Sequence, residues 1–286
     1  MGSVENGILK TLAYSDCFNY PLTISQIWKY LIIGEKVGKN KIAETLKKSK
    51  IIEKKDIYFF LKHEISIVER RKDREKISLK KLFLTKHFAK TLSLIPTVNL
   101  VGISGSLAMY NASENDDIDF FIISSPGTLW ITRLICVLAL VVLGVKRMRV
   151  GKNHKNKICL NMYIDESQMT LPEEHHNLYT AHEVVQLMPV INKKNTHEQF
   201  LKKNAWVLNY MPNSIDSKIL SLPDHVNSSF TFLLPFEIIA KRFQLWYMRK
   251  HLTSESVLDK YIAFHPRDVT GKILKAYANK CKSYNL

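Results

Sequence analysis

The N-terminal part of the chain carries apolar residues at the spacing of short helices, followed by segments with β character. Three helices are predicted, around Ile8, Leu9 and Leu12, over LTISQIWKYLI (22–32), and over GKNKIAETLKKSKII (38–52). The second follows Pro21 and has Thr23 as its N-cap. IYFFL (57–61) and ISIVE (65–69) are predicted to form a β-hairpin. Three helices and a hairpin is the order of a winged helix-turn-helix, so we expect a winged-helix-like domain over residues 1–75.

A run of charged residues, RRKDREKISLKK (70–81), comes next, with seven basic and two acidic side chains. Such runs are typical of solvated helix faces and linkers. We expect this run to join two domains and to lead into a helix over LKKLFLTKHFAKTLSL (79–94).

Strand and helix patterns alternate over residues 97–165. The predicted strands are TVNLVGI, DIDFFIIS and KICLNMYI, and the helices between them are SLAMYNA and the apolar run 129–145. This βαβαβ order predicts a second domain, over residues 76–170, in which helices cover one face of a mixed sheet.

Residues 171–286 have a mostly helical pattern, in LYTAHEVVQLM, THEQFLKKNAWVLNYM, PFEIIAKRFQLWYMRK and VTGKILKAYANK. The aromatic side chains of these stretches, including Trp206, Tyr210, Trp246 and Tyr247, are expected in helical cores. The whole chain is thus predicted to be α+β, with a helical C-terminal region over 171–286.

The longest apolar run, residues 129–145, contains Arg133, and its uninterrupted part is shorter than the roughly 20 residues of a membrane span. We expect a helix that is covered on nearly all sides, and no membrane partner. The first residues lack a secretory signal, and the four cysteines are scattered without a Cys-x-x-Cys pair. A cytoplasmic location is expected.

Positive charge is concentrated near the N-terminus. The net charge is +16, of which residues 1–90 carry +10. A basic winged helix would attract nucleic acid, with the third helix facing phosphates through Lys39, Lys41, Lys47 and Lys48. The same charges could form a solvated surface, and the domain could serve packing or dimerisation.

Candidate chemistry lies in VGISGSLAMYNASENDDIDFFII. Gly105 lets the backbone approach a ligand, and Ser106 starts a helix whose N–H groups and hydroxyl can hold phosphate oxygens. Asp117 and Asp119 are two residues apart on a strand, so both side chains project from one face. Their carboxylates repel one another, and a bound Mg²⁺ would remove that repulsion.

Gly-Ser, ten intervening residues and Asp-Ile-Asp within apolar strands resemble the motif of the polymerase-beta nucleotidyltransferase superfamily. The resemblance covers roughly residues 80–165. The order of winged helix, core and helical tail also resembles uncharacterised bacterial proteins with a nucleotidyltransferase domain. The resemblance implies transfer of a nucleoside monophosphate from a nucleoside triphosphate (NTP) to an acceptor. It assigns Asp117 and Asp119 to Mg²⁺ or Mn²⁺, and Gly105 and Ser106 to the triphosphate.

The third carboxylate of that superfamily has no clear counterpart. On the next strand the central polar-facing residue is Asn161, whose amide oxygen can ligate a metal but cannot act as a base. Either two carboxylates suffice, or Asp165 or Glu166 substitutes, or catalysis has been lost. Arg133 opens an apolar helix and either reaches a phosphate or an aspartate, or extends its charge to the helix edge.

Two functions are therefore expected as alternatives. The first is a metal-dependent nucleotidyltransferase that uses an NTP and an acceptor of open identity. The second is a nucleotide sensor with an impaired transferase fold, or a winged-helix regulator that binds nucleic acid. The intact Gly105-Ser106 and Asp-Ile-Asp favour the first, and Asn161 favours the second.

Overall fold

The N-terminal unit packs three helices against a small antiparallel sheet in a computed structural model that describes residues 3–61, 66–148, 154–224, 230–249, 256–258, 260–263 and 267–286. Its elements are α1 (Ser3–Asp16), β1 (Leu22–Thr23), α2 (Ile24–Lys29), α3 (Lys39–Lys48), β2 (Ile52–Lys55) and β3 (Tyr58–Leu61). Thr23 caps α2 as predicted, because its side chain accepts a hydrogen bond from the Gln26 backbone and the Gln26 side chain accepts one in return. Ile42 and Leu46 bury one side of α3.

The hairpin of this unit is displaced from the expected one. β3 pairs with β2 through a turn at Asp56, which has a φ of 55°. The expectation of a strand at 65–69 is wrong, because the chain is helical from Ser66 onward. Ile67, Val68 and Arg71 are buried together, which is the i, i+1, i+4 spacing of a helix face rather than the alternation of a strand.

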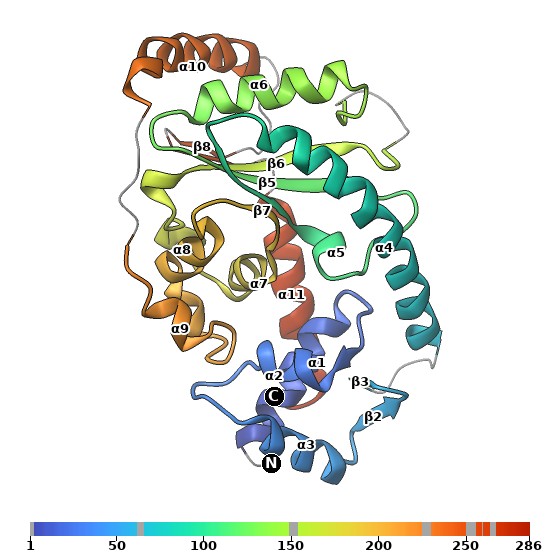
Figure 1. The fold of residues 1–286 in the computed structure, drawn as a ribbon. Helices are drawn as coiled ribbons and strands as arrows, with labels where there is room; N and C mark the ends of the chain where they lie inside the picture. The colour runs from blue at the N-terminus through green and yellow to red at the C-terminus, as the bar shows by residue number, and fades with distance from the viewer. Residues whose placement is uncertain are drawn as a thin grey trace.

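Helix α4 (Ser66–Ser93) has 28 residues and is about 42 Å long. It runs from the N-terminal unit along the side of the molecule to the central sheet (Figure 1). The charged run 70–81 is therefore part of one continuous helix with the segment 79–94 that it was expected to lead into. Two of its basic side chains, Arg71 and Lys81, are buried, and the Lys81 Nζ donates to the Asp116 carbonyl at 2.7 Å.

The central sheet contains six described strands in the order β7-β4-β5-β6-β9-β8. Their bounds are β4 (Val98–Ile103), β5 (Ile118–Ser124), β6 (Ile158–Asp165), β7 (Met188–Asn192), β8 (Ser256–Leu258) and β9 (Tyr261–Ala263). β5 and β6 are parallel, and the other neighbours are antiparallel. The sheet is thus mixed, as the sequence predicts, and the α+β class is confirmed.

Helices cover both faces of this sheet rather than the one face expected. α6 (Leu129–Val142) and α10 (Leu234–Arg249) lie on one face, and α7 (Leu178–Gln186), α8 (Thr196–Lys203) and α9 (Ser217–Leu220) lie towards the other (Figure 1). Along β5, Phe120 joins the core beneath α6, whereas Phe121 joins the core that contains α7 and α8. Because successive side chains alternate, Asp119 shares the face of Phe121.

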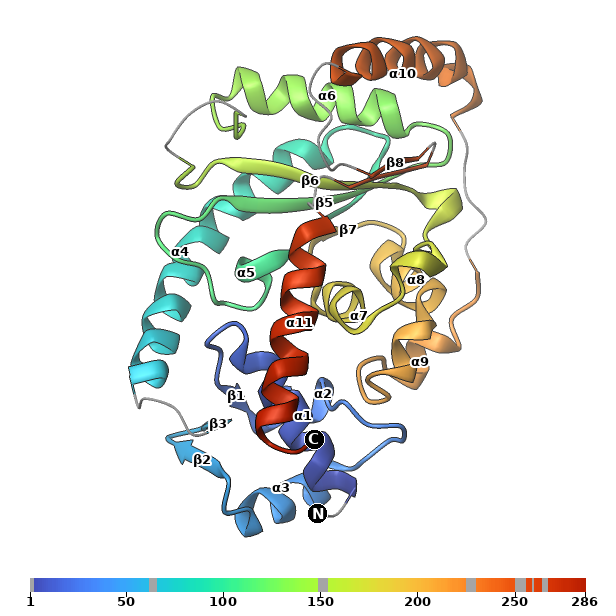
Figure 2. The same cartoon turned by 180° about the vertical axis from the view of Figure 1, so that it is seen from behind.

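The region 171–286 is mostly helical, but it also completes the sheet. β7 pairs with β4, and β9 pairs with β6. α11 (Arg267–Ser283) runs from the sheet back to α1 (Figure 2), where Lys280 forms an ion pair with Asp16. The helical C-terminal region expected from the sequence is therefore joined to both preceding segments.

Two expectations about apolar helices are wrong. α6 is not covered on nearly all sides, because Leu138 and Val142 are 54% and 86% exposed. Trp246 and Tyr247 of α10 are also exposed, at 60% and 57%, rather than in a helical core. Among the described residues, no helix combines the length and the apolar character needed to cross a membrane.

Arg71 ties α4 to the turn that follows the Gly-Ser motif. Its Nη1 donates to the carbonyls of Met109 and Tyr110 at 2.9 and 3.2 Å, and its guanidinium lies 3.9 Å from the ring centroid of Tyr20. Glu75 completes the set with an ion pair of 2.7 Å. The helix, the N-terminal unit and the motif turn are thus joined at one buried cation.

Arg71→Met should lower the free energy of unfolding by about 2–3 kcal/mol, because it leaves buried carbonyls without their charged donor. Denaturant unfolding monitored by circular dichroism measures the change. Lys72→Met is the matched control, because Lys72 pairs with Asp56 at the exposed surface and its loss should scarcely move the midpoint. Equal effects of the two substitutions would show that Arg71 is not the anchor.

Candidate functional site

The β4–α5–β5 segment brings the Gly-Ser motif against the second aspartate. Gly105, at the start of α5 (Gly105–Ala108), has a φ of 65°, and a Cβ added to it would lie 3.1 Å from the Asp119 Oδ2. A side chain at this position would be both strained and crowded, so the close contact requires glycine. The structure thus brings together Gly105, Ser106, Asp117 and Asp119, four of the residues singled out from the sequence.

Asp117 is held by a cation that the sequence did not indicate. The Arg147 Nη1 donates to its Oδ2 at 2.6 Å, and the Arg147 guanidinium also lies 3.8 Å from the Cys159 Sγ. The Asp117 side chain is 18% exposed and the Arg147 side chain 40%. The ion pair neutralises one carboxylate of the pair, and a metal ion at Asp117 would have to compete with Arg147.

Asp119 is the more buried carboxylate. Burial and the neighbouring charge of Asp117 raise the pKa of Asp119 to about 7, although a hydrogen bond from Cys159 acts in the opposite direction. The same burial, with the charge of Asp119, raises the pKa of the Cys159 thiol to about 12. At neutral pH the thiol is therefore a neutral donor, and Asp119 lies close to its own titration point.

These residues form a group that fits a divalent cation in part. One ligand atom from each of Asp117, Asp119 and Cys159 lies within 4.8 Å of the others. Two carboxylates are the oxygen donors that Mg²⁺ and Mn²⁺ prefer, and a cation would reverse the repulsion that raises the pKa of Asp119. A thiol is a poor ligand for Mg²⁺, so the two aspartates would provide the protein's oxygen ligands.

Cys159 occupies the position opposite Asp119 that the sequence interpretation gives to Asn161. The parallel register pairs Asp119 with Cys159, and a bulge at Asn161 then shifts the pairing, so that Phe121 faces Met162. The buried Asn161 amide donates to the Ser104 Oγ at 3.4 Å. A thiol, rather than the Asn161 amide, therefore lies beside Asp119 on β6.

Neither carboxylate proposed as a substitute is directed to the aspartate pair. The Asp165 Oδ2 accepts a hydrogen bond from the Gly127 backbone at 2.7 Å, and its Oδ1 accepts one from Ser167. The Glu166 carboxylate accepts a hydrogen bond from the Asn99 amide at 2.5 Å. Both acidic residues organise the far end of β6 and the adjoining loops.

Arg133 also lies apart from the group. Its Nη1 donates to the Oε1 of Gln244, which is buried on α10. This contact is on the face of the sheet covered by α6, whereas Asp119 shares the face of Phe121, on the other side. The structure does not bring Arg133 to the aspartates.

Ser106 extends its hydroxyl to a third acidic residue. Its Oγ donates to the Asp116 Oδ2 at 3.2 Å, and the Ser113 backbone donates to the same oxygen at 2.8 Å. Burial raises the pKa of Asp116, but hydrogen bonds from Ser113 and Ser106 outweigh it and leave the pKa below its ordinary value. Asp116 thus stays ionised and fixes the loop that returns to β5.

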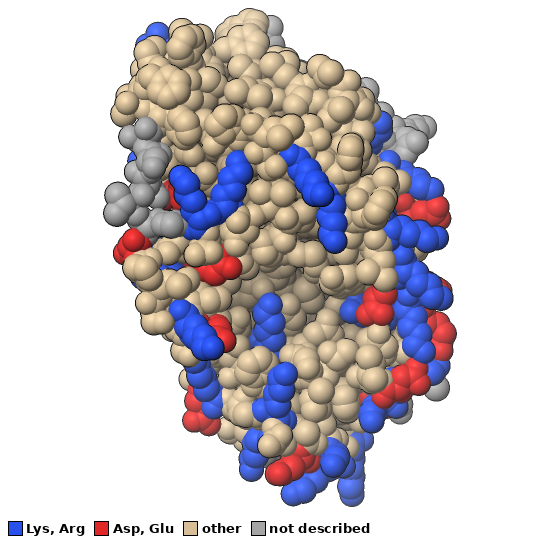
Figure 3. Space-filling model, viewed as in Figure 1, with Lys and Arg blue, Asp and Glu red and all other residues tan. Residues whose placement is uncertain are grey.

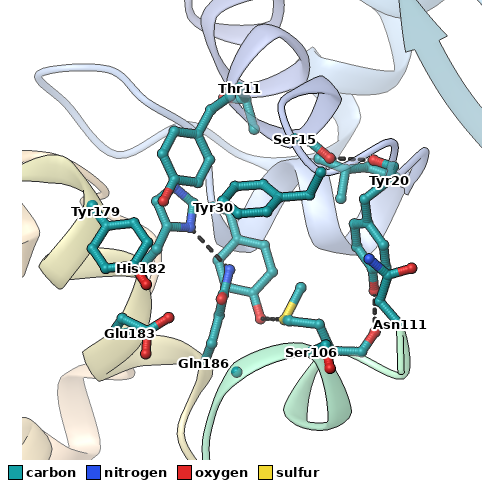
Figure 4. A pocket seen from close by; sticks show the side chains of 15 residues that line it. Thr11, Ser15, Tyr20, Tyr30, Ser106, Asn111, Tyr179, His182, Glu183 and Gln186 are labelled. Atoms are coloured by element: carbon teal, nitrogen blue, oxygen red, sulfur yellow. Dashed lines mark hydrogen bonds between the residues drawn. The ribbon is translucent and has the colours of Figure 1, made fainter. Parts of the chain in front are cut away.

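A cavity of about 270 Å³ adjoins Gly105 and Ser106. It lies between α1 and α2 of the N-terminal unit and α7 of the C-terminal region, and its walls are largely aromatic (Figure 4). The aromatic lining residues are Tyr14, Phe18, Tyr20, Tyr30 and Tyr179. Concave, mainly apolar sites with a few polar groups are typical of small-molecule binding.

The polar groups of the cavity come mainly from α7. Figure 4 shows Glu183, Gln186 and Ser106 at the end of the cavity opposite Thr11. Burial, with the charge of Asp119, raises the pKa of Glu183 to about 7. Glu183 is thus an acidic residue that lines the cavity and whose pKa is raised in part by the charge of Asp119.

His182 is a packing residue. Its ring stacks on Tyr14 with centroids 4.0 Å apart, and its Nδ1 interacts with the Gln186 amide at 3.0 Å. Burial lowers the pKa of His182 to about 3, so the ring is neutral. The stack fixes α7 against α1 and gives the cavity a rigid wall.

Three residues of this site escaped the sequence interpretation: Cys159, Arg147 and Glu183. Cys159 and Asn161 are two residues apart, so in a regular strand both side chains would point to the same face. Only the register of β6 against β5 shows that Cys159 is the one opposite Asp119. Arg147 belongs to a basic loop with no distinguishing pattern. Glu183 lies on a helix that the sequence assigns to a separate region, and the packing of α7 beside α5 brings it near the motif.

No match emerges from comparison of the chain with models of known protein families, with curated proteins or with solved structures.

The raised pKa of Asp119 predicts a pH-dependent cost in stability. An aspartate in the unfolded chain ionises at a pKa of about 3.9, whereas Asp119 in the folded chain ionises at about 7. Between these values rising pH favours the unfolded chain, and the cost is complete above pH 7. Asp119→Asn removes this cost. Without divalent cation, the free energy of unfolding of the variant minus that of the parent should therefore be larger at about pH 8 than at about pH 4, by on the order of 3 kcal/mol.

Urea unfolding across this pH range provides the measurement. Asp73→Asn is the control, because Asp73 is exposed on α4 and its substitution should add no such pH dependence. A parent and an Asp119→Asn variant with parallel pH profiles would mean that Asp119 ionises normally in the folded chain.

Proposed function

We propose that this protein is a metal-dependent nucleotidyltransferase that moves a nucleoside monophosphate from an NTP to an acceptor hydroxyl. The observation that carries the proposal is the close approach of the Gly105 backbone to Asp119, beside Asp117, in the β4–α5–β5 connection. The succession α4, β4, α5, β5, α6, β6 over residues 66–165 supports a nucleotidyltransferase core.

Asp117 and Asp119 would hold Mg²⁺ or Mn²⁺. The cation supplies charge stabilisation to the triphosphate and to the oxygens that exchange at phosphorus. Arg147 would release Asp117 when the cation binds, and its guanidinium then remains beside the site as a phosphate ligand. Gly105 leaves room for the triphosphate to approach the backbone, and the Ser106 hydroxyl can turn from Asp116 to a phosphate oxygen.

The aromatic cavity would hold the acceptor. Its volume and its Tyr- and Phe-rich walls suit a small organic molecule or a single extended side chain rather than a duplex. Glu183 would accept the proton of the acceptor hydroxyl as that oxygen bonds to the α-phosphorus, while the bond to the leaving pyrophosphate breaks. A carboxyl with a pKa near neutrality suits this role.

The alternative is a sensor that binds nucleotide without turnover, and two observations favour it. Cys159 provides no negative charge opposite Asp119, and Arg147 already neutralises Asp117. The N-terminal unit, with its order α1, β1, α2, α3, β2, β3, supports a winged helix, and all four lysines of α3 singled out above are exposed. Such a unit could bind nucleic acid in a way that depends on whether nucleotide is bound.

Incubation of the purified protein with labelled NTPs and Mg²⁺ or Mn²⁺ tests the proposal. Small hydroxyl compounds, the protein itself and cellular RNA would each be offered as acceptors. We expect metal-dependent transfer that Asp119→Asn reduces by about 10³-fold or more, because the cation loses a buried ligand. Asp73→Asn should retain full transfer. If nucleotide binds but no label is transferred to any of these acceptors, the protein would instead be assigned as a nucleotide sensor.

Glu183→Gln should lower turnover by about 10²–10⁴-fold while nucleotide affinity stays nearly unchanged, because the amide fills the same space but takes no proton. The pH dependence of turnover should lose its limb near pH 7. Glu174→Gln, at an exposed position ahead of α7, is the control. If Glu183→Gln retained full turnover, Glu183 would only line the cavity and would not act as the proton acceptor.

A further inference from the structure

The outer sides of α6 and α10 form a continuous apolar surface. More than half of each side chain is exposed at Val142 of α6 and at Phe236, Ile239, Phe243 and Trp246 of α10. The two helices pack side by side, through Ala240, Gln244 and Met248, which are the buried face of α10. We name this outer face the α6–α10 surface.

The area of the α6–α10 surface exceeds what a monomer usually exposes. Eleven large apolar residues on these two helices are 40–86% exposed. With roughly 200 Å² for each side chain, the exposed apolar area is on the order of 1,000 Å². The largest apolar patch of a typical monomer is roughly 300–600 Å², and larger patches mark protein or membrane contacts.

The charges around this surface have one sign. α6 contains one basic residue, Arg133, and no Asp or Glu. α10 adds Lys241, Arg242 and Arg249, with Glu237 as its acidic residue. The two Glu237 oxygens accept hydrogen bonds from backbone N–H groups at the start of α6, both at 2.8 Å. In Figure 3 the upper part of the molecule, over α6 and α10, is almost entirely tan.

We propose that the α6–α10 surface binds an anionic lipid bilayer, with both helices lying in the plane of the interface. Phe236, Phe243 and Trp246 would enter the boundary between headgroups and acyl chains, and Arg242 and Arg249 would contact lipid phosphates. Apolar residues with aromatic side chains, flanked by basic residues, are the features of interfacial helices. A second copy of the chain would instead bring two basic rims together, which charge repulsion opposes.

The geometry permits this binding while the candidate active site is in use. The cavity is lined in part by α7, which lies on the opposite face of the sheet from α6 and α10 (Figure 1). Substrate entry would therefore not be blocked by the bilayer. The proposal rests on the exposed surface and its charge, so it is independent of the proposed transfer reaction.

Flotation of the full-length protein with vesicles tests the proposal. We expect binding to vesicles of phosphatidylglycerol and phosphatidylcholine in equal parts, and weak binding to phosphatidylcholine alone. Phe243→Ser/Trp246→Ser should weaken binding to the anionic vesicles by about tenfold or more, because it removes two buried aromatic groups. Phe83→Ser/Leu94→Ser is the matched control, since these apolar residues are 79% and 80% exposed outside the surface.

A charge variant, Arg242→Gln/Arg249→Gln, keeps the test valid if the aromatic variant folds poorly. It should weaken binding to anionic vesicles about tenfold and leave binding to phosphatidylcholine unchanged. Equal losses in the aromatic variant and its control would overturn the proposal. Absence of vesicle binding would also overturn it. If the protein instead formed a dimer that Phe243→Ser/Trp246→Ser dissociates, the α6–α10 surface would be assigned to self-association.

Discussion

The contact between the Gly105 backbone and the Asp119 carboxylate is the constraint on which the site depends. A φ of 65° and the lack of room for a Cβ fix the path of the chain from β4 through α5 to β5. That path buries Asp119 beside Asp117, where two like charges oppose one another. The surrounding residues relieve this strain in separate ways: Arg147 pairs with Asp117, and Cys159 donates to Asp119. A pKa near 7 for Asp119 is the remaining cost.

Two buried cations hold α4 and the N-terminal unit to the connection between β4 and β5. Arg71 and Lys81, both on α4, donate to backbone carbonyls on either side of the loop between α5 and β5. Arg71 also stacks on Tyr20, which lines the cavity. The charged part of α4 is thus a structural support that sets the N-terminal unit over the Gly-Ser motif. One wall of the cavity depends on this support, and the other depends on the His182–Tyr14 stack.

The sequence allowed prediction of the elements whose pattern is local. β4, β5, β6 and α6 follow from their apolar runs, and Gly105, Ser106, Asp117 and Asp119 follow from motif spacing. β2, with the sequence IEKK, lacks an apolar pattern, and its strand character comes from pairing with β3. Cys159 depends on a bulge in β6, and Glu183 on the packing of α7. These depend on tertiary register, which no single segment encodes.

The apolar composition of α6 and α10 did not reveal that the outer sides of these helices are exposed. An apolar helix predicts burial, yet α6 covers the sheet with one side and exposes Leu138 and Val142 on the other. α10 packs on α6 through Ala240, Gln244 and Met248, with Gln244 bonded to Trp130 and Arg133, and its outer side adds further apolar surface. α10 thus has a polar contact on its inner side and aromatic residues on its outer side. A helix whose outer side faces water usually has the opposite arrangement. This inversion is what a second apolar phase against the α6–α10 surface would explain.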